Sequence, residues 1–141
     1  QSAIALVEAI RLDLKARDIV TREAIEALGV ADHFRLVHDT FHHHLAGGGP
    51  IFAWHTGMVH VSGVVDPVLA VSEMRDAHRV HVDARDRLGN LAQIAALLEA
   101  GYEGPVSVEC FAPEVHALAD PSAALSESFE FIRSHLTAEA A

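Results

Sequence analysis

The segment Gly104-Pro105-Val106-Ser107-Val108-Glu109-Cys110-Phe111 contains an apolar β-strand pattern that ends in a carboxylate. Three other apolar segments end in the same way, on a side chain that can bind a metal ion: 4–8, 34–39 and 58–60. In parallel α/β folds the active site lies at the carboxyl ends of the strands. The four strand-end side chains are Glu8, Asp39, His60 and Glu109.

These four side chains form a chemically coherent set. Three carboxylates and one imidazole offer mainly oxygen ligands, which suit Mg²⁺, Mn²⁺, Co²⁺ or Zn²⁺. Any one of them alone is more often a helix cap, a solvated loop residue or a hydrogen-bonded core histidine. Their repetition at four successive strand ends favours a metalloenzyme.

Composition restricts the class of protein. The chain has 141 residues, half of them apolar, which predicts one domain spanning 1–141 with a real core. The net charge of -10 argues against nucleic-acid binding, although one local arginine could still hold an anionic substrate. A single cysteine excludes an intrachain disulfide and favours a reducing, cytoplasmic location. No apolar run reaches the roughly 20 residues of a membrane span.

Helical patterns follow each of the predicted strands, which indicates βα units and a parallel sheet. We expect helices over 17–28, 41–45 and 88–98, and a last helix that begins at Asp120-Pro121. Gly47-Gly48-Gly49-Pro50 lacks the Lys-Ser/Thr ending of a phosphate loop and predicts a turn. The polar stretch 66–87 is expected to form an active-site loop or lid, with a short helix over 67–75.

The histidines and the cysteine near the strand ends differ in their expected roles. His42 follows Asp39 by about one helical turn, so it alone of the three consecutive histidines is expected to share the face of Asp39. His43 and His44 are expected to be surface or packing residues. His38 precedes Asp39 and should therefore point toward the outer helices. Cys110 is expected to pack rather than to act as a nucleophile.

Three motifs together resemble the sugar phosphate isomerase/epimerase superfamily, the xylose isomerase-like TIM barrels that include inosose isomerases and ketose 3-epimerases. They are Val37-His38-Asp39-Thr40-Phe41-His42-His43-His44, Val59-His60-Val61-Ser62 and Val106-Ser107-Val108-Glu109-Cys110-Phe111. The resemblance covers nearly the whole chain. It implies an α/β fold of four βα units with parallel strands, corresponding to the C-terminal half of a (β/α)₈ barrel.

The resemblance also implies residue roles. Glu8, Asp39, His60 and Glu109 match the family's ligands of a divalent cation, for which Mn²⁺, Mg²⁺, Co²⁺ and Zn²⁺ are all suitable. His42 matches the histidine that contacts substrate oxygen. Arg79 is the best match for the arginine that contacts substrate, with Arg85 and Arg87 as lesser candidates.

The expected reaction is isomerisation or epimerisation of a ketose sugar or a cyclitol. Glu8 and Glu109 are the candidate acid and base, one removing and the other returning a proton next to a carbonyl, through a metal-stabilised enediolate. One alternative is a non-catalytic half-barrel that binds a metal or ligand and needs a partner. A metallohydrolase of the endonuclease IV type is a second, but it requires more metal ligands.

Two departures from the family concern sequence and length. Ala9 stands where a proline often follows the first Glu, and 82–89 lacks the usual Pro-Gly-x-Gly turn. A complete barrel takes about 250 residues, so the first four βα units are absent from these 141 residues. A half-barrel has open strand edges. We therefore expect either a missing half upstream of Gln1 or association of two halves, including a homo-oligomer.

Overall fold

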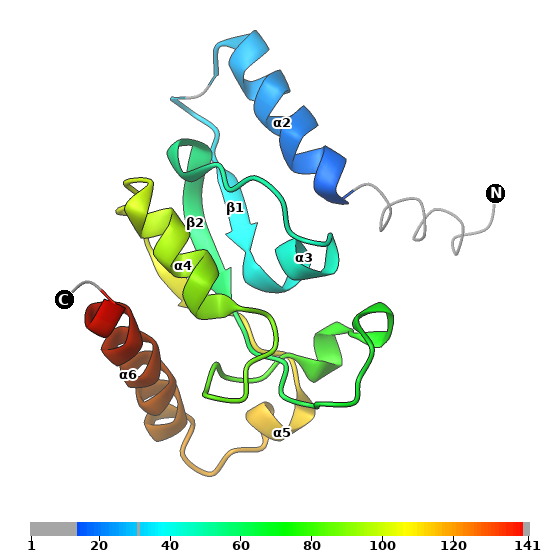
Figure 1. Cartoon of the computed structure of the whole chain (residues 1–141), viewed down its shortest axis with the longest axis vertical. Coiled ribbons are helices and arrows are strands. Elements are labelled where there is room, and N and C mark those ends of the chain that lie inside the picture. Colours follow the sequence, from blue (N-terminus) through cyan, green and yellow to red (C-terminus); the bar gives the residue numbers. More distant parts are fainter. Residues whose placement is uncertain (1–13, 31, 140–141) are drawn as a thin grey trace.

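The computed structural model describes residues 14–30 and 32–139, in which helices alternate with the strands of one sheet (Figure 1). The predicted strand 4–8 and its Glu8 lie outside the described residues. The elements are α2 (Leu14–Leu28), β1 (Leu36–Asp39), α3 (Thr40–Leu45), β2 (Thr56–Val61), α4 (Asn90–Glu99), β3 (Val106–Val108), α5 (Pro113–His116) and α6 (Pro121–Glu139), with single 3₁₀ turns at Ala53–His55, Val71–Glu73 and Asp76–His78.

The sheet has three parallel strands in the order β1-β2-β3, so the strand that follows each helical connection lies beside the previous strand. Asp39 at the end of β1 is the register partner of His60 in β2. His60 is in turn the partner of Ser107 in β3. The backbone N–H of Glu109 donates to the carbonyl of Val61 at 2.9 Å, which extends this register one step past β3. The predicted α/β fold with parallel βα units is confirmed.

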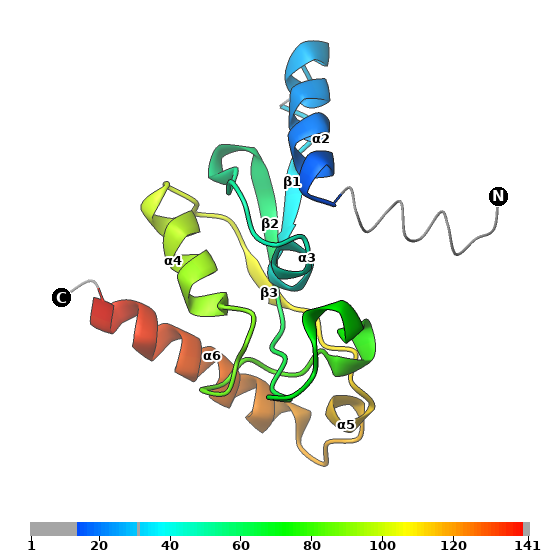
Figure 2. The same cartoon turned by 45° about the vertical axis from the view of Figure 1, so that its right-hand side comes forward.

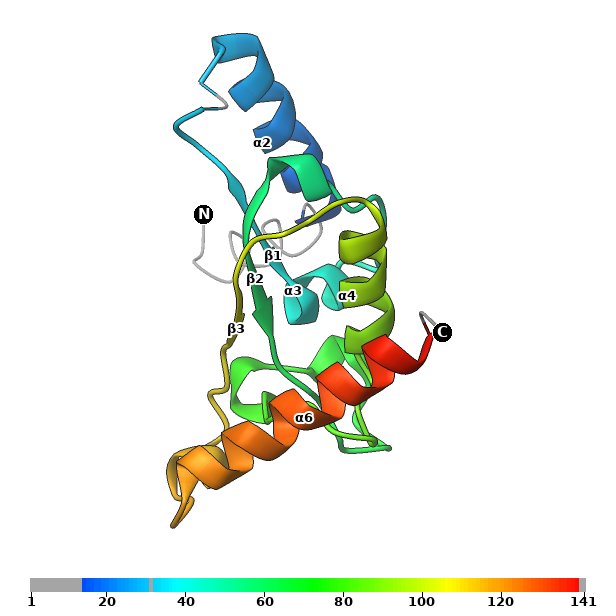
Figure 3. The same ribbon diagram turned by 90° about the vertical axis from the view of Figure 1, so that its left-hand side faces the viewer.

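The helices cover one face of the sheet (Figure 3). Val59 and Val61 of β2 are fully buried against Ile94 of α4 and Ile132 of α6. Because successive side chains of a strand point to opposite faces, the neighbours of these valines in the strand point away from the helices. On that face Val37 is 52% exposed and Met58 is 38% exposed, so it is open to solvent among the described elements.

His38 lies on the helix side of β1, as its parity predicted. Its ring is buried, and Nε2 lies 2.9 Å from Oε1 of Gln93 on α4. The amide nitrogen of Gln93 donates to the carbonyl oxygens of Thr40 and Leu88. Because that nitrogen is the donor, Oε1 accepts, and Nε2 of His38 is the donor of the bond between them. This buried network connects α4 to β1 and to the start of α3.

In Figure 2, α2 lies on the side of the sheet where β1 is, and α6 lies on the opposite side.

The expected helix over 67–75 is wrong. The segment instead contains the 3₁₀ turn Val71–Glu73, followed by a second such turn at Asp76–His78. Met74 between them is fully buried with Phe41, Val64 and Leu88 in a small second core. A side chain anchored in this way holds the segment against the sheet end, so the long polar connection is packed.

Other local expectations agree with the structure. The carboxylate of Asp120 accepts the backbone N–H of Ala123 at 2.9 Å, which caps the start of α6. Gly47, Gly48 and Gly49 all have positive φ, which L side chains rarely adopt, and they form the turn after α3. Within the described residues, no helix is both long and apolar enough to span a membrane.

Candidate metal centre

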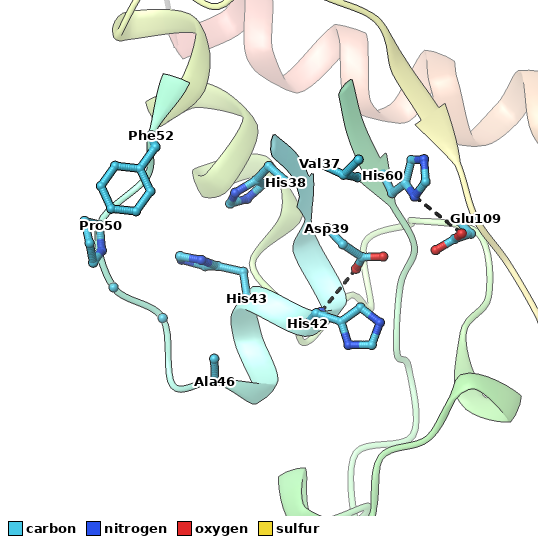
Figure 4. A pocket seen from close by; sticks show the side chains of 12 residues that line it. Val37, His38, Asp39, His42, His43, Ala46, Pro50, Phe52, His60 and Glu109 are labelled. Carbon is cyan, nitrogen blue, oxygen red and sulfur yellow. Dashed lines mark hydrogen bonds and ion pairs between the residues drawn. The ribbon is translucent and has the colours of Figure 1, made fainter. Parts of the chain in front are cut away.

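Asp39, His60 and Glu109 come together at the carboxyl ends of three adjacent strands (Figure 4). One ligand atom from each lies within 4.8 Å of the others. Ligand atoms around a single ion with bonds of about 2.1 Å lie roughly 3–4 Å apart, so small side-chain movements suffice to coordinate one. Two carboxylates and an imidazole are also a suitable donor set for a divalent cation. The three side chains could therefore hold a metal ion.

Local backbone structure explains the position of Asp39. The residue ends β1 and is the N-cap of α3, and its Oδ1 accepts the backbone N–H groups of Phe41 at 2.9 Å and His42 at 3.1 Å. Its Oδ2 accepts a hydrogen bond from Nη2 of Arg79 at 2.8 Å. Burial alone raises the pKa of Asp39, but the Arg79 guanidinium and the His42 N–H outweigh it and hold this pKa below its usual range. Asp39 is therefore ionised at neutral pH.

His60 and Glu109 face each other across β2 and β3. Nδ1 of His60 lies 3.4 Å from Oε1 of Glu109, and its Nε2 lies 3.1 Å from the sulfur of Met58. The other carboxylate oxygen of Glu109, Oε2, pairs with Nη2 of Arg79 at 2.8 Å. Both side chains are partly exposed, and they line a cavity next to Asp39.

That cavity has a volume of about 350 Å³, which lies within the range of small-molecule sites, about 300–1,000 Å³. Polar groups line the end beside the three candidate ligands, and Phe52 and Pro50 form an apolar wall further along (Figure 4). The remaining lining residues come from β1, α3 and the glycine turn: Val37, His38, His42, His43, Ala46, Gly48 and Gly49.

The two residues expected to contact substrate occupy different environments. His42 is exposed at the cavity wall, and its ring packs edge-on against Phe41. The side chain of Arg79 is only 1% exposed and pairs with Asp39 and Glu109. A substrate contact stays a prediction for both residues. The buried position of Arg79 was not expected from its place in a polar loop.

Sequence reasoning missed the groups that surround Arg79. Ser62 accepts a hydrogen bond from Nε of Arg79 at 2.9 Å, and Asp76 accepts a longer one from Nη1 at 3.3 Å. The rings of Phe41 and Phe111 lie 4.9 Å and 5.2 Å from the guanidinium carbon. Ser62 was detectable in principle, because it follows His60 by two residues and shares its strand parity. Phe41 and Phe111 show the same spacing, because they follow Asp39 and Glu109 by two residues.

Comparison with known proteins identifies the family of the fold. The xylose isomerase-like TIM barrel family matches residues 19–135. A crystal structure of a xylose isomerase domain-containing protein from Salmonella typhimurium LT2 is similar, with a TM-score of 0.71 and 26% identity over 84% of this chain. A crystal structure of the IolI protein with a bound zinc atom has a TM-score of 0.67 and 23% identity over 81% of this chain. No curated protein sequence matches significantly.

The match is partial on the side of the relatives. This chain covers 44% of the Salmonella protein and 42% of the IolI protein, so it spans less than half the length of either. That proportion agrees with the half-barrel predicted from the sequence. The family match covers most of the chain, and the strands are parallel with three candidate ligands at their carboxyl ends. The chain belongs to the xylose isomerase-like TIM barrel family.

Proposed function

We propose that the protein is a divalent-metal-dependent isomerase or epimerase of a ketose sugar or cyclitol. The observation that carries the proposal is the convergence of Asp39, His60 and Glu109 at three neighbouring strand ends, beside a cavity of small-molecule size. Membership of a family named for an isomerase supports the reaction class. The zinc atom in the similar IolI structure supports a bound divalent metal.

The described residues that would hold the ion are Asp39, His60 and Glu109, and Glu8 is the fourth ligand that the resemblance implies. β1 has no partner among the described strands on the side away from β2, which is the edge where strand 4–8 would pair. When bound, a divalent cation supplies Lewis-acid stabilisation of the negative charge that develops on the substrate oxygens.

The protein's own groups move the proton. Glu109 is partly exposed at the cavity, and its carboxylate would remove or return the proton on the carbon next to the carbonyl. Glu8 is the candidate for the converse step. His42 at the cavity wall donates a hydrogen bond to a substrate hydroxyl.

We also propose that the open face of the sheet is covered in the working protein. Val37 and Met58 expose apolar side chains there, on the same face as the ligands. The other four βα units of the barrel are the expected cover, and association of two copies is the alternative. A native mass equal to that of the denatured polypeptide favours the first, and a native mass twice that of the denatured polypeptide favours the second.

The substitution Glu109→Gln in the full-length protein tests the function. Proton transfer is read by NMR as incorporation of deuterium from D₂O next to the carbonyl, across a panel of ketoses and cyclitol ketones. We expect the rate to fall by about 10²- to 10⁴-fold, the usual contribution of a general acid or base, and the bound metal to decrease. The matched control is Glu103→Gln, an exposed residue outside the cavity.

Two results would contradict the proposal. Full turnover and full metal content in the Glu109→Gln protein would remove both roles from this carboxylate. A wild-type protein that binds metal but exchanges no proton with any substrate would favour the non-catalytic binding half-barrel.

A further inference from the structure

Arg79 is a fully buried cation that is surrounded by carboxylates. Its Nη2 donates to Oδ2 of Asp39 and pairs with Oε2 of Glu109, both at 2.8 Å. Nη1 lies 3.3 Å from Asp76. A buried charge is costly unless it is paired and hydrogen-bonded, so the position of this guanidinium depends on those carboxylates. Equally, two carboxylates that converge on one point repel each other unless a cation lies between them.

The rest of the guanidinium is held by groups that fix its plane. Nε donates to Oγ of Ser62, which is itself fully buried just after β2. The rings of Phe41 and Phe111 lie about 5 Å from the guanidinium carbon, in the range of cation–π contact. Phe41 also donates its backbone N–H to Asp39, so one residue positions both members of the Asp39–Arg79 pair.

The main chain of Arg79 is attached to two strand ends. Its carbonyl oxygen accepts the N–H groups of Phe111 at 3.1 Å and Ala112 at 3.0 Å, just past Glu109. The next residue, Val80, exchanges hydrogen bonds of 2.9 Å and 2.7 Å with Gly63, just past His60. Arg79 is therefore fixed with respect to the two strands that carry His60 and Glu109.

We propose that Arg79 is a positioning residue of the metal centre, which orients Asp39 and Glu109 for the ion, and that it does not contact substrate. By taking Oε2 of Glu109, the guanidinium leaves Oε1 facing His60. The guanidinium also donates to Oδ2 of Asp39, while two backbone N–H groups donate to Oδ1. Together these hydrogen bonds fix the orientation of the Asp39 carboxylate. This inference rests on the proposed metal-dependent function and assigns to Arg79 a role different from the substrate contact that the resemblance implies.

The substitution Arg79→Met in the full-length protein tests this role. Calorimetric titration with Mn²⁺ gives the affinity, and the visible absorption of the Co²⁺-loaded protein reports the ligand geometry. We expect the affinity to fall by about 10- to 100-fold, as for other groups that orient metal ligands, and the Co²⁺ spectrum to change. Arg133→Met is the matched control, because the exposed Arg133 side chain pairs with Glu130 on α6, and the substitution should leave both readouts unchanged.

If the Arg79→Met protein does not fold, the same measurements are made on the Arg79→Lys protein. Lysine retains a charge that can meet the carboxylates, but it lacks the planar fork that also reaches Ser62. We expect a folded protein whose metal affinity lies between those of the wild type and the Met variant.

The possible results distinguish a positioning role of Arg79 from a substrate contact, and they test the proposed reaction separately. Unchanged metal affinity and Co²⁺ spectrum in a folded Met or Lys variant, together with a raised KM, would overturn the positioning role and restore the substrate contact. Metal binding by the wild type without any isomerase activity would contradict the proposed reaction while leaving the Arg79 role intact. Failure of the wild type to bind metal would overturn both.

Discussion

At the scale of single residues, Asp39 combines three tasks. It ends β1, caps α3 through two backbone N–H groups, and pairs with Arg79. The strand alternation read from sequence placed its side chain on the open face and that of His38 on the helix face, and both positions are found in the structure. The same alternation could not reveal Arg79 as the partner, because Arg79 belongs to no strand.

Cys110 follows Glu109, and its environment leads to a prediction about pH dependence. Burial raises the pKa of its thiol to about 11, and the nearby Arg79 only partly offsets this. A raised thiol pKa means less thiolate, so at pH 8 we expect alkylation on the order of 100-fold slower than for a free cysteine of pKa about 8.5. The rate should rise with pH toward that pKa. The denatured protein is the control, and equal rates in the folded and denatured states would contradict the prediction.

At the scale of elements, α4 is positioned by polar as well as apolar contacts. Ile94 and Leu97 pack on the sheet, while Gln93 connects the helix to His38, Thr40 and Leu88. The helix itself was predictable from its apolar spacing. The network was not, because a glutamine within such a pattern is more often a surface residue.

Replacing Gln93 with Leu should destabilise the protein. The change leaves His38 and two carbonyl oxygens without their partner in a buried location. An unsatisfied buried polar group costs about 1–3 kcal/mol, and we expect the free energy of unfolding in urea to fall by about that amount. Glu99→Leu, at an exposed position of the same helix, should change it by less than about 0.5 kcal/mol. Equal effects of the two substitutions would show that the network contributes nothing.

At the scale of the whole molecule, the described sheet is one part of a barrel wall. Its helix-covered face contains the main core, and its open face carries the candidate ligands at one end. A metal ion held by Asp39, His60 and Glu109 would bind the folded sheet and not the unfolded chain. Binding of this kind stabilises the folded state by mass action.

Metal-stripped full-length protein should therefore gain thermal stability when Mn²⁺ is added. At a free concentration about 100 times the Kd, the gain is about 2.7 kcal/mol, measurable as a rise in Tm by calorimetry and reversed by EDTA. The His60→Ala protein should not gain stability, because it lacks one of the three ligands. The same rise in that variant would place the stabilising ion elsewhere.

The sequence by itself determined the parallel βα order, the strand faces, and the three strand-end side chains, since each depends on a local period or on the side chain at the strand end. The tertiary structure alone decided that the polar segment 66–87 is packed and that Arg79 is buried between Asp39 and Glu109. Those outcomes depend on contacts between residues far apart in sequence, such as Asp39 and Arg79, which are 40 positions apart. No local pattern encodes them, because a buried charge is stable only where several distant groups pair with it.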